Sequence, residues 1–266
     1  MISSWGVVAS VWRWRRLVRE LARRDFQARY AGSLLGAAWA VVQPAVHFGL
    51  YWVVFDRLLG TRLASGDGVG PFALYLLSGL VPFLALQEML QRAVSLAQEQ
   101  AALIRHVNVP VEVLVSGALL GVAARQAVAL VLVAAACGLV GTLGVAQLPA
   151  LALGLGMLLV AGWGVALTLF VVGAFVPDSQ QVVAVGSLVA LFATPIVYRE
   201  AAVPAHFRGW FDVNPLTGLV DLFRVGLVGG TLSPTRTTLA AVVTVLCVGA
   251  GLWLLQRRAA SVRDVV

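Results

Sequence analysis

The side chains best suited to chemistry in this sequence are arginines that stand next to long apolar runs. All nineteen basic residues are arginine and none is lysine. A Walker A loop places a lysine on the β- and γ-phosphates of a nucleotide, so this chain cannot supply such a loop itself. A guanidinium group instead binds phosphate through two parallel hydrogen bonds. Because Arg24 and Arg29 lie just before the first long apolar run, they are candidates to hold a phosphate group where that run begins.

Arg125 falls inside another apolar run, where a charge is costly and normally faces a partner or water. If that span starts near Glu112, Arg125 lies about 20 Å into it, at 1.5 Å per residue. If the span starts later, Arg125 only reaches back to the inner interface, and both positions remain open. We expect no acidic residue to accompany Arg125 within the spans. An ion-coupled carrier needs ionisable groups near the bilayer midplane, so it stays an alternative.

Residue sets for covalent or metal chemistry are not visible in the sequence. We find no Ser/His/Asp or Cys/His nucleophile set, and the twelve acidic residues are scattered singly, so paired carboxylates for acid–base catalysis are not apparent. His47, His106 and His206 are isolated, which does not suit a metal site. Cys137 and Cys247 fall inside predicted spans and are interpreted as packing residues. A membrane enzyme is therefore a second alternative.

The elements that must position these arginines are membrane-spanning helices. The chain is 60% hydrophobic and only 12% charged, whereas soluble domains are about 25% charged. A bilayer core needs about 20 apolar residues of helix, and several windows without charge reach that length. We therefore predict an all-α integral membrane protein with six transmembrane helices. The predicted spans are residues 34–55, 71–91, 113–139, 150–175, 182–198 and 237–256.

The arginine distribution predicts the topology. In residues 1–33, tryptophan and apolar residues are mixed with seven arginines, which is typical of an amphipathic helix in the headgroup layer. Residues 34–256 are expected to form the transmembrane domain and residues 257–266 a cytoplasmic tail. Thirteen arginines fall inside and six outside, so the positive-inside rule places both termini in the cytoplasm. The same rule explains the net charge of +7 better than nucleic-acid binding does.

Two segments between the spans are candidates for function. Within the main internal loop, residues 97–107 could form a short helix that ends before Pro110. An exposed helix between two spans is a suitable contact for a cytosolic protein that drives transport. A solvated linker is the alternative. Residues 199–235 are too apolar for a free loop and too broken to span, so we expect two short re-entrant or interfacial helices before the last span. Asp221 and Arg224 lie three residues apart there and could pair.

Several motifs, taken in order, resemble one family over nearly the whole chain. The motifs are Arg24-Asp25, Arg29-Tyr30, Ser33, Leu35-Gly36, Trp39, Pro44, Ser78-Gly79-Leu80, Pro82-Phe83, Leu103-Ile104, Val109-Pro110, Glu112, Pro195-Ile196, Tyr198, Asn214-Pro215 and Arg224. This pattern resembles the permease (transmembrane) subunits of type 2 ABC exporters that move O-antigen, teichoic acid or capsular polysaccharide. One departure is Val176-Pro177-Asp178, where the family often has an aromatic residue, arginine and aspartate.

The resemblance implies a homodimer of six-span subunits in the bacterial inner membrane. It also implies a separate cytosolic ATP-binding subunit in two copies, which would hold ATP and Mg, so no cofactor is expected in this chain. The substrate would be a glycan linked to lipid through a polyprenyl diphosphate. A drug or small-lipid exporter permease of the same superfamily is the alternative to this substrate.

The resemblance further assigns roles to individual residues. The substrate diphosphate would meet Arg24, Arg29 and Tyr30 at the membrane entrance. The coupling helix docked on the ATPase would include Gln98, Glu99, Gln100, Leu103, Ile104 and Arg105. Aromatic side chains that could stack on sugars in the channel or at its exit are Trp163, Phe170, Phe192, Tyr198 and Trp210. For each of these aromatic residues, the alternative is a structural role in the aromatic belt at the lipid interface or in the protein core.

Overall fold

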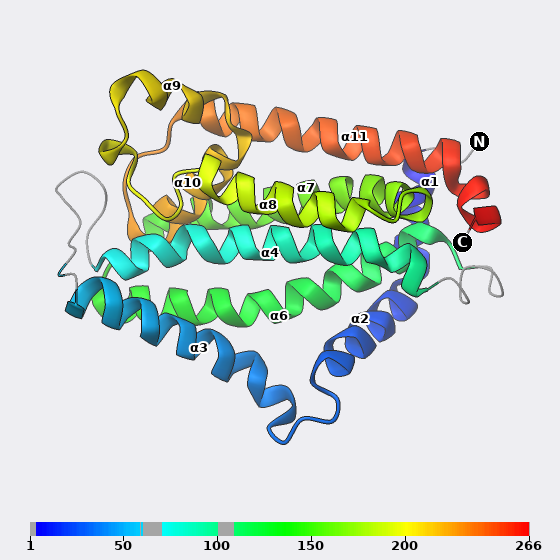
Figure 1. The fold of residues 1–266 in the computed structure, drawn as a ribbon, viewed down its shortest axis with the longest axis horizontal. Coiled ribbons are helices and arrows are strands. Elements are labelled where there is room, and N and C mark those ends of the chain that lie inside the picture. Colours follow the sequence, from blue (N-terminus) through cyan, green and yellow to red (C-terminus); the bar gives the residue numbers. More distant parts are fainter. Residues whose placement is uncertain (1–3, 59, 61–70, 101–108, 266) are drawn as a thin grey trace.

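The computed structural model describes residues 4–58, 60, 71–100 and 109–265. Within these ranges the chain folds into helices and contains no strand. The α-helices are α1 (Ser4–Arg13), α2 (Arg15–Tyr30), α3 (Trp39–Trp52), α4 (Phe72–Glu99), α6 (Val111–Val140), α7 (Leu148–Phe175), α8 (Ser179–Ala193), α9 (Ala205–Val213), α10 (Pro215–Val228) and α11 (Pro234–Val265). The long helices run side by side, with α1 and the end of α11 at one end of the bundle and α9 at the other (Figure 1).

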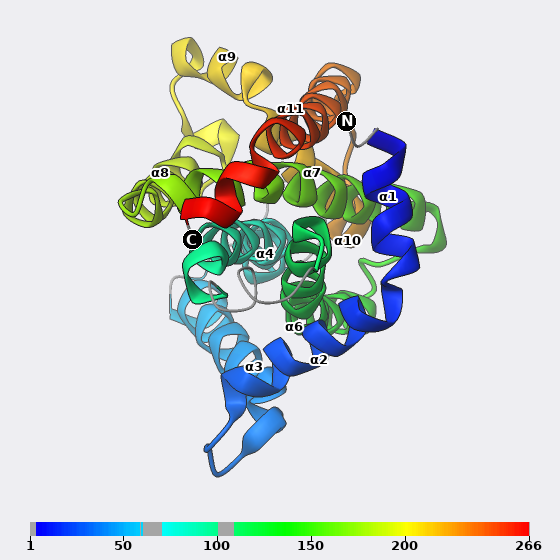
Figure 2. The ribbon, with the colours of Figure 1, turned by 90° about the vertical axis from the view of Figure 1, so that its right-hand side faces the viewer.

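Helix α2 packs along α6 because two glycines of α6 make room for it. A Cβ atom at Gly117 would lie 2.7 Å from Leu21 Cβ, and one at Gly121 would lie 2.8 Å from a carboxylate oxygen of Asp25. Small residues spaced four apart let helix backbones approach closely in membrane proteins. Figure 2 shows α1 and α2 wrapping the outside of the bundle. The amphipathic N-terminal segment is therefore attached to the helices that follow it.

Helix α3 leans away from the bundle at its first residues and meets it at its last (Figure 1). It follows a turn in which Gly32 and Gly36 have φ angles of 78° and 51°, a region where a residue with a Cβ would be strained. The helix contains Pro44 and continues as a π-helical segment through Leu58. Few of its side chains are buried within the chain, so most of the apolar surface of α3 is exposed.

Helix α4 lies at the centre of the bundle, where α6, α7, α8 and α10 pack around it (Figure 2). Its apolar positions are mostly buried. A Cβ at Gly173 of α7 would lie 2.2 Å from the Val94 carbonyl oxygen of α4, and one at Gly251 of α11 would lie 2.2 Å from the Gly164 carbonyl oxygen of α7. Helices α4, α7 and α11 therefore pack backbone against backbone.

The chain between α8 and α11 forms a cap at the end of the bundle opposite α1. Asn214 starts α10, since its side-chain oxygen accepts a hydrogen bond from the Leu216 amide at 3.0 Å and Pro215 takes the first helical position. Helix α10 packs against α4, α7 and α11 and is largely buried, whereas α9 is mostly exposed. The segment predicted to hold two short helices before the last span contains these two.

Five helical segments among the described residues are long and apolar enough to cross a membrane. They are Gly36–Leu58, Phe72–Glu99, Val111–Val140, Val145–Phe175 and Pro234–Arg258. These segments correspond to five of the six predicted spans. The predicted span 182–198 corresponds to α8, whose 15 residues are fewer than the about 20 that a bilayer core requires.

Several predicted boundaries differ from the structure, most of all at the ends of α4, α8 and α11. Helix α4 continues to Glu99 instead of ending at residue 91, because Arg92 pairs with Glu99 along the same helix and with Asp25 of α2. Polar residues whose charges are satisfied do not end a helix. In the segment 257–266, predicted as a cytoplasmic tail, α11 continues through Val265.

Candidate functional site

A cleft of about 420 Å³ opens between α3, α4 and α6, next to the end of α2. Its lining includes the polar side chains Arg29, Glu88, Arg125 and Gln126. Apolar and aromatic residues make up much of the rest, among them Trp39, Phe48, Tyr51, Leu80 and Leu84. A cleft with this lining suits a molecule that has a charged group and an apolar tail.

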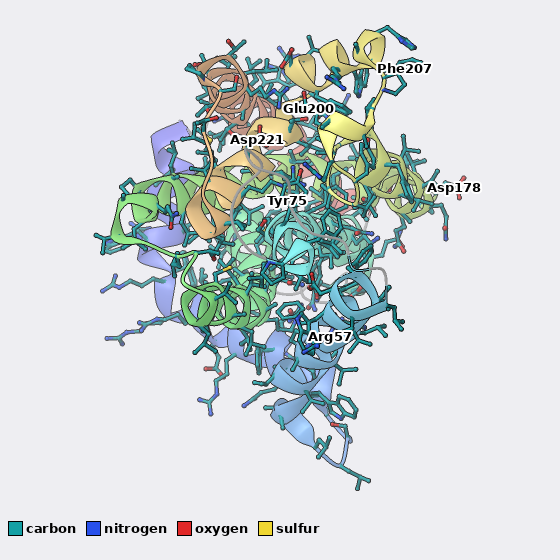
Figure 3. All side chains as sticks on the ribbon, turned by 90° about the vertical axis from the view of Figure 1, so that its left-hand side faces the viewer. Arg57, Tyr75, Asp178, Glu200, Phe207 and Asp221 are labelled. Carbon is teal, nitrogen blue, oxygen red and sulfur yellow. The ribbon has the colours of Figure 1, made fainter. Side chains whose placement is uncertain are left out.

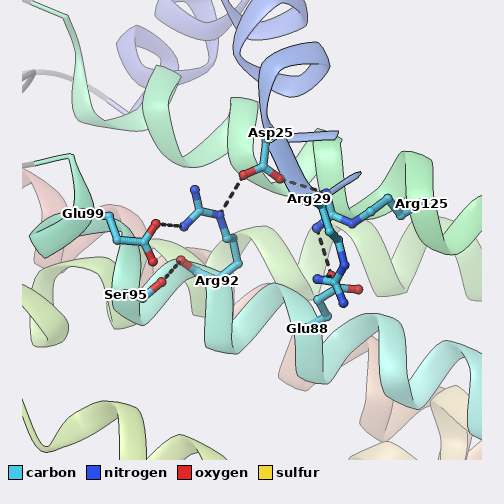
Figure 4. Close-up of polar contacts among 7 residues, drawn as sticks. All are labelled: Asp25, Arg29, Glu88, Arg92, Ser95, Glu99 and Arg125. Carbon is cyan, nitrogen blue, oxygen red and sulfur yellow. Dashed lines mark hydrogen bonds and ion pairs between the residues drawn. The ribbon is translucent and has the colours of Figure 1, made fainter. Parts of the chain in front are cut away.

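Three donors from two helices, α2 and α6, converge on the carboxylate of Glu88 in α4. Arg29 Nη1 and Arg125 Nη2 both donate to Glu88 Oε1, at 2.8 Å and 2.9 Å. Gln126 Nε2 donates to Glu88 Oε2 at 2.6 Å. Figure 4 shows Arg29 and Arg125 directed at this carboxylate from α2 and α6. Glu88 therefore joins the end of α2 to α4 and α6.

Asp25 of α2 makes a second junction with the same helices. Its Oδ1 accepts from Arg92 Nε of α4 and its Oδ2 from Arg125 Nη1 of α6, both at 2.9 Å. Arg92 also forms an ion pair with Glu99, about two helical turns further along α4. These contacts make one continuous network (Figure 4), which we call the α2 ion network: Asp25, Arg29, Glu88, Arg92, Glu99 and Arg125.

The α2 ion network holds three arginines and three acids, so its formal charges cancel. Arg125 is the most buried member, with 7% of its side chain exposed. Removing a charge from water costs several kcal/mol unless partners replace the water, and Arg125 has two carboxylates for this purpose. Its Nε atom is buried and has no hydrogen-bond partner among the described residues, so Arg125 keeps an unused donor.

The expectation that no acid accompanies Arg125 within the spans is wrong. Glu88 lies in α4, inside the predicted span 71–91, and bonds to Arg125 directly. Helix α6 begins at Val111, so Arg125 lies fourteen residues (125 − 111) and about 21 Å into it. The arginine is tolerated there because α2 brings Asp25 to it from 100 positions away.

Two of the three residues predicted at the entrance line the cleft. Arg29 is half exposed, at 50% of its side chain, and Tyr30 packs edge-on against Phe26 with ring centroids 5.5 Å apart. Arg24 is exposed on α2, does not line the cleft and has no ion-pair partner within the described ranges. The site also contains Glu88 and Gln126, which sequence reasoning did not single out.

The five aromatic candidates lie in different environments. Phe170 is fully buried in the core, so a sugar reaches it only if the surrounding helices separate. Trp163 is partly buried and donates through Nε1 to the Ser116 hydroxyl at 2.9 Å. The other three lie near the cap. Phe192 and Trp210 are each 58% exposed, and the Tyr198 hydroxyl donates to the Phe192 carbonyl oxygen at 2.6 Å.

A second set of charges holds the cap together around Arg236 at the start of α11. Its guanidinium binds both carboxylate oxygens of Glu200, at 2.8 and 2.9 Å. It also donates to Asp212 Oδ1 at 2.8 Å and to Asp221 Oδ2 at 3.4 Å. Figure 3 shows Glu200 and Asp221 close together on this end of the molecule. One arginine thus joins the segment before α9 to α9, α10 and α11.

The predicted pair of Asp221 and Arg224 is confirmed, with 3.9 Å between Oδ1 and Nη1. Burial raises the pKa of the Asp221 carboxyl, and the nearby arginines partly oppose that shift. Arg224 also donates to the Ile196 carbonyl oxygen at 3.2 Å, and its guanidinium carbon lies 4.0 Å from the Tyr75 ring centroid. Burial lowers the pKa of Arg224. The cap is therefore anchored to α4 by a cation–π contact.

The predicted coupling residues fall partly outside the described residues. Leu103, Ile104 and Arg105 lie there, whereas Gln98 and Glu99 end α4 and Gln100 follows them. Gln98 Nε2 donates to the Gly173 carbonyl oxygen at 3.3 Å, and its Oε1 accepts from Gln180 Nε2 at 3.4 Å. The end of α4 is thus tied to the end of α7 and the start of α8.

No group of three or more His, Cys, Asp or Glu side chains in the described part of the chain is arranged to hold a metal ion. The comparison with protein families gives a match to the ABC-2 type transporter family over residues 16–228. The chain belongs to the ABC-2 type transporter family. With five helices able to cross a membrane, it is a multi-pass membrane protein.

Several relatives align with about four fifths of this chain. The polysialic acid transport protein KpsM of Escherichia coli is 24% identical over 217 residues, which cover 81% of this chain and 83% of the relative. The O-antigen export system permease protein RfbA of Klebsiella pneumoniae is 22% identical over 217 residues, or 80% of each chain. A protein of the same name from Myxococcus xanthus is 25% identical over 108 residues, 41% of this chain and 39% of the relative.

Proposed function

We propose that this chain is the membrane-spanning subunit of an ATP-driven exporter that moves a lipid-linked polysaccharide, such as O-antigen, teichoic acid or capsule, across the bacterial inner membrane. One observation carries this proposal: proteins named for polysialic acid transport and O-antigen export align with about four fifths of the chain, at 81% and 80%. The cleft beside α2 supports it, because it combines arginines with an apolar lining.

ATP hydrolysis belongs to a separate cytosolic ATPase, present in two copies with ATP and Mg, and the chain itself is not the enzyme. The absence of lysine supports this division, since this sequence has no Walker A loop. A homodimer of this chain forms the channel. The exposed apolar surface of α3 and of α8 is compatible with such an assembly.

The topology has six spans, with α8 as the fifth, and both termini in the cytoplasm. Helix α1 and the end of α11 lie at the same end of the bundle, as this topology requires. Residues 1–33 then lie at the cytoplasmic interface, 34–256 form the transmembrane domain, and α9 and α10 lie at the outer face. Residues 257–266 extend α11 on the cytoplasmic side.

The coupling helix near residues 97–107 transmits ATPase movements to the spans. The hydrogen bonds from Gln98 to Gly173 and from Gln180 to Gln98 support this role, because a push on the end of α4 also acts on α7 and α8. At the other end, Tyr198, Trp210 and Phe192 are positioned near the cap for contact with sugars that leave the channel.

The diphosphate of the lipid carrier enters beside Arg29 and Tyr30, with Arg24 on the approach along α2. Arg29 is half exposed and lines the cleft, so it is accessible to an anion. The polyprenyl chain remains in lipid and against the apolar side chains of α3. Guanidinium groups suit this task because they bind phosphate oxygens in pairs.

The test is to tag this chain in its native host, purify it in mild detergent and measure whether an ATPase subunit co-purifies in equal amount with ATP hydrolysis. In parallel, cells depleted of the chain are extracted for lipid-linked polymer. We expect an active, equimolar ATPase and polymer trapped inside the depleted cells. A chain that purifies alone, under conditions that preserve known ABC exporters, contradicts the exporter assignment. An active ATPase without trapped polymer contradicts the polysaccharide substrate and favours a drug or small-lipid exporter.

A further inference from the structure

We propose that Glu88 is a placeholder anion, whose carboxylate occupies the position that the phosphate of a prenyl diphosphate takes when the cleft is loaded. The proposal rests on the proposed function for the kind of substrate, and on the cleft's own geometry for the role of Glu88. Binding then exchanges one anion for another on Arg29, Arg125 and Gln126.

The geometry around Glu88 is that of an oxyanion site. Two guanidinium groups and one amide direct N–H donors at its two oxygens, over 2.6 to 2.9 Å. Phosphate oxygens take the same donors at similar distances. All four side chains line one cleft of about 420 Å³, so a ligand in the cleft meets the same donors.

The charges around the cleft favour replacement of the Glu88 carboxylate by a diphosphate over addition of a second anion. With Glu88 and Asp25 in place, the positive charges of Arg29 and Arg125 are already matched by two carboxylates. A diphosphate added to that set would compete for the same N–H groups and repel Glu88 in a region of low dielectric constant. When the Glu88 carboxylate moves away, the two arginines become available to the incoming anion.

Arg125 can keep its position during such an exchange, because burial and Asp25 both hold its side chain. Asp25 accepts a hydrogen bond from Arg125 Nη1 at 2.9 Å, so one of the two carboxylate partners of Arg125 remains when Glu88 moves away, and 93% (100 − 7) of the Arg125 side chain is buried. Its Nε donor is buried without a partner in the described part of the chain. A diphosphate has more free acceptor oxygens than a carboxylate and can offer one to that atom, whereas the two oxygens of Glu88 are already engaged by three donors.

The side chain of Arg29, in contrast, can change position when an anion binds. Half of its side chain is exposed, and its one described ion pair is with Glu88. It stands at the last turn of α2 and lines the cleft. The arginine can therefore follow an anion into the cleft with little change elsewhere, while α3 offers Trp39 and Phe48 to the prenyl chain.

The experiment measures binding of farnesyl diphosphate to the purified chain in nanodiscs, with farnesol and inorganic pyrophosphate as comparison probes. We compare wild type with Glu88→Gln, Arg29→Gln and, as a matched control, Glu20→Gln. Glu20 is exposed on the same helix α2 and does not line the cleft. Folding of each variant is checked by its thermal unfolding midpoint.

We expect Glu88→Gln to bind farnesyl diphosphate about tenfold more tightly than wild type, because the competing anion that keeps roughly nine tenths of the sites closed is gone. Arg29→Gln should bind at least about tenfold more weakly, since a charged hydrogen bond is lost, and Glu20→Gln should match wild type. If Glu88 had a purely structural role, Glu88→Gln would weaken the binding of farnesyl diphosphate or leave it unchanged. Either of those two results in a folded variant overturns the proposal.

The comparison probes separate the sources of the phosphate. If pyrophosphate binds as tightly as farnesyl diphosphate and also gains from Glu88→Gln, the site takes a free anion and the assignment to a prenyl diphosphate is overturned. If farnesol binds equally, the arginines play no part and the exchange is overturned. These outcomes are independent of whether an ATPase co-purifies, so the placeholder role of Glu88 can fail while the exporter assignment stands.

Discussion

Substituting Asp25 by alanine should loosen α2 from the bundle more than any other single change in that helix. The carboxylate of Asp25 bonds to Arg92 and Arg125, each at 2.9 Å. Alanine removes both bonds and leaves two buried guanidinium groups with one carboxylate fewer between them. The remaining contacts of α2 with α6, at Leu21 against Gly117, are van der Waals contacts that do not replace the lost charge.

The size of the effect follows from the burial of the partners. Breaking a buried ion pair from one side costs about 3–5 kcal/mol. Asp25 is 14% exposed and Arg92 19% exposed, so water replaces part of the lost interaction and the lower value, about 3 kcal/mol, applies. Alanine favours helix over aspartate by up to about 0.7 kcal/mol, which works against the loss. A net destabilisation of about 2–3 kcal/mol corresponds to roughly 30- to 150-fold in the opening equilibrium of α2.

Amide hydrogen exchange in nanodiscs measures that opening helix by helix. The amides of α2 should exchange about 30- to 150-fold faster in Asp25→Ala, while those of α7 and α11 stay unchanged. Glu20→Ala on the exposed face of α2 is the control and should resemble wild type. The double variant Asp25→Ala with Arg125→Met should recover part of the protection, because the uncompensated charge is gone. Exchange of α2 in Asp25→Ala within threefold of wild type would refute the view that charge holds this helix.

Two further perturbations test the packing of the bundle and the cap. Gly251→Ala puts a Cβ 2.2 Å from a carbonyl oxygen of α7, so it should lower the free energy of unfolding by about 1–3 kcal/mol and with it the thermal unfolding midpoint. The control Gly249→Ala, on the same helix with open space around its Cβ, should be neutral or slightly stabilising. Equal effects of the two variants would contradict the close approach of α11 to α7. Arg236→Ala leaves three carboxylates of the cap without their shared cation and should cost about 2 kcal/mol after allowance for the exposed Asp212. Arg236→Lys should regain only part of this in the same assay, because an ammonium group cannot bind Glu200 with two parallel bonds; full recovery would mean that charge alone matters.

The helices of the bundle could be predicted because membrane spans leave a long local signal. The predicted ranges 113–139 and 150–175 differ by only two residues at most from α6 and α7, since a bilayer core requires a long run of mostly apolar residues. The ends of α4 and α11 could not be predicted in the same way. At the end of α4, Arg92 continues the helix because Asp25, far away in sequence, pairs with it. At the end of α11, Arg257 instead lies over the Trp253 ring of the same helix.

The site could be predicted only in part, for the same reason. Arg29 and Tyr30 were found from their place at the start of the first span, and both line the cleft. Asp25 reaches Arg125 across 100 positions, a distance at which no spacing rule applies. Glu88 did carry a local signal, because an acid inside an apolar span indicates a partner or a functional role. Reading Glu88 and Arg125 as one pair would have placed the polar end of the cleft from the sequence.

Because Asp25 and Glu88 share Arg125, the attachment of α2 to the bundle and the occupancy of the cleft affect each other. One carboxylate attaches α2 to the bundle and the other lines the cleft, and both bond to the same guanidinium. Any ligand that changes the occupancy of the Glu88 side changes the strength of the Asp25 side, and linkage requires the reverse effect to be equal. Farnesyl diphosphate should therefore change the exchange rate of α2 amides, and the cost of Asp25→Ala in that assay should differ between free and loaded protein by the factor by which Asp25→Ala changes farnesyl diphosphate affinity. An affinity that is unchanged in folded Asp25→Ala would show that the two carboxylates do not act on each other through Arg125.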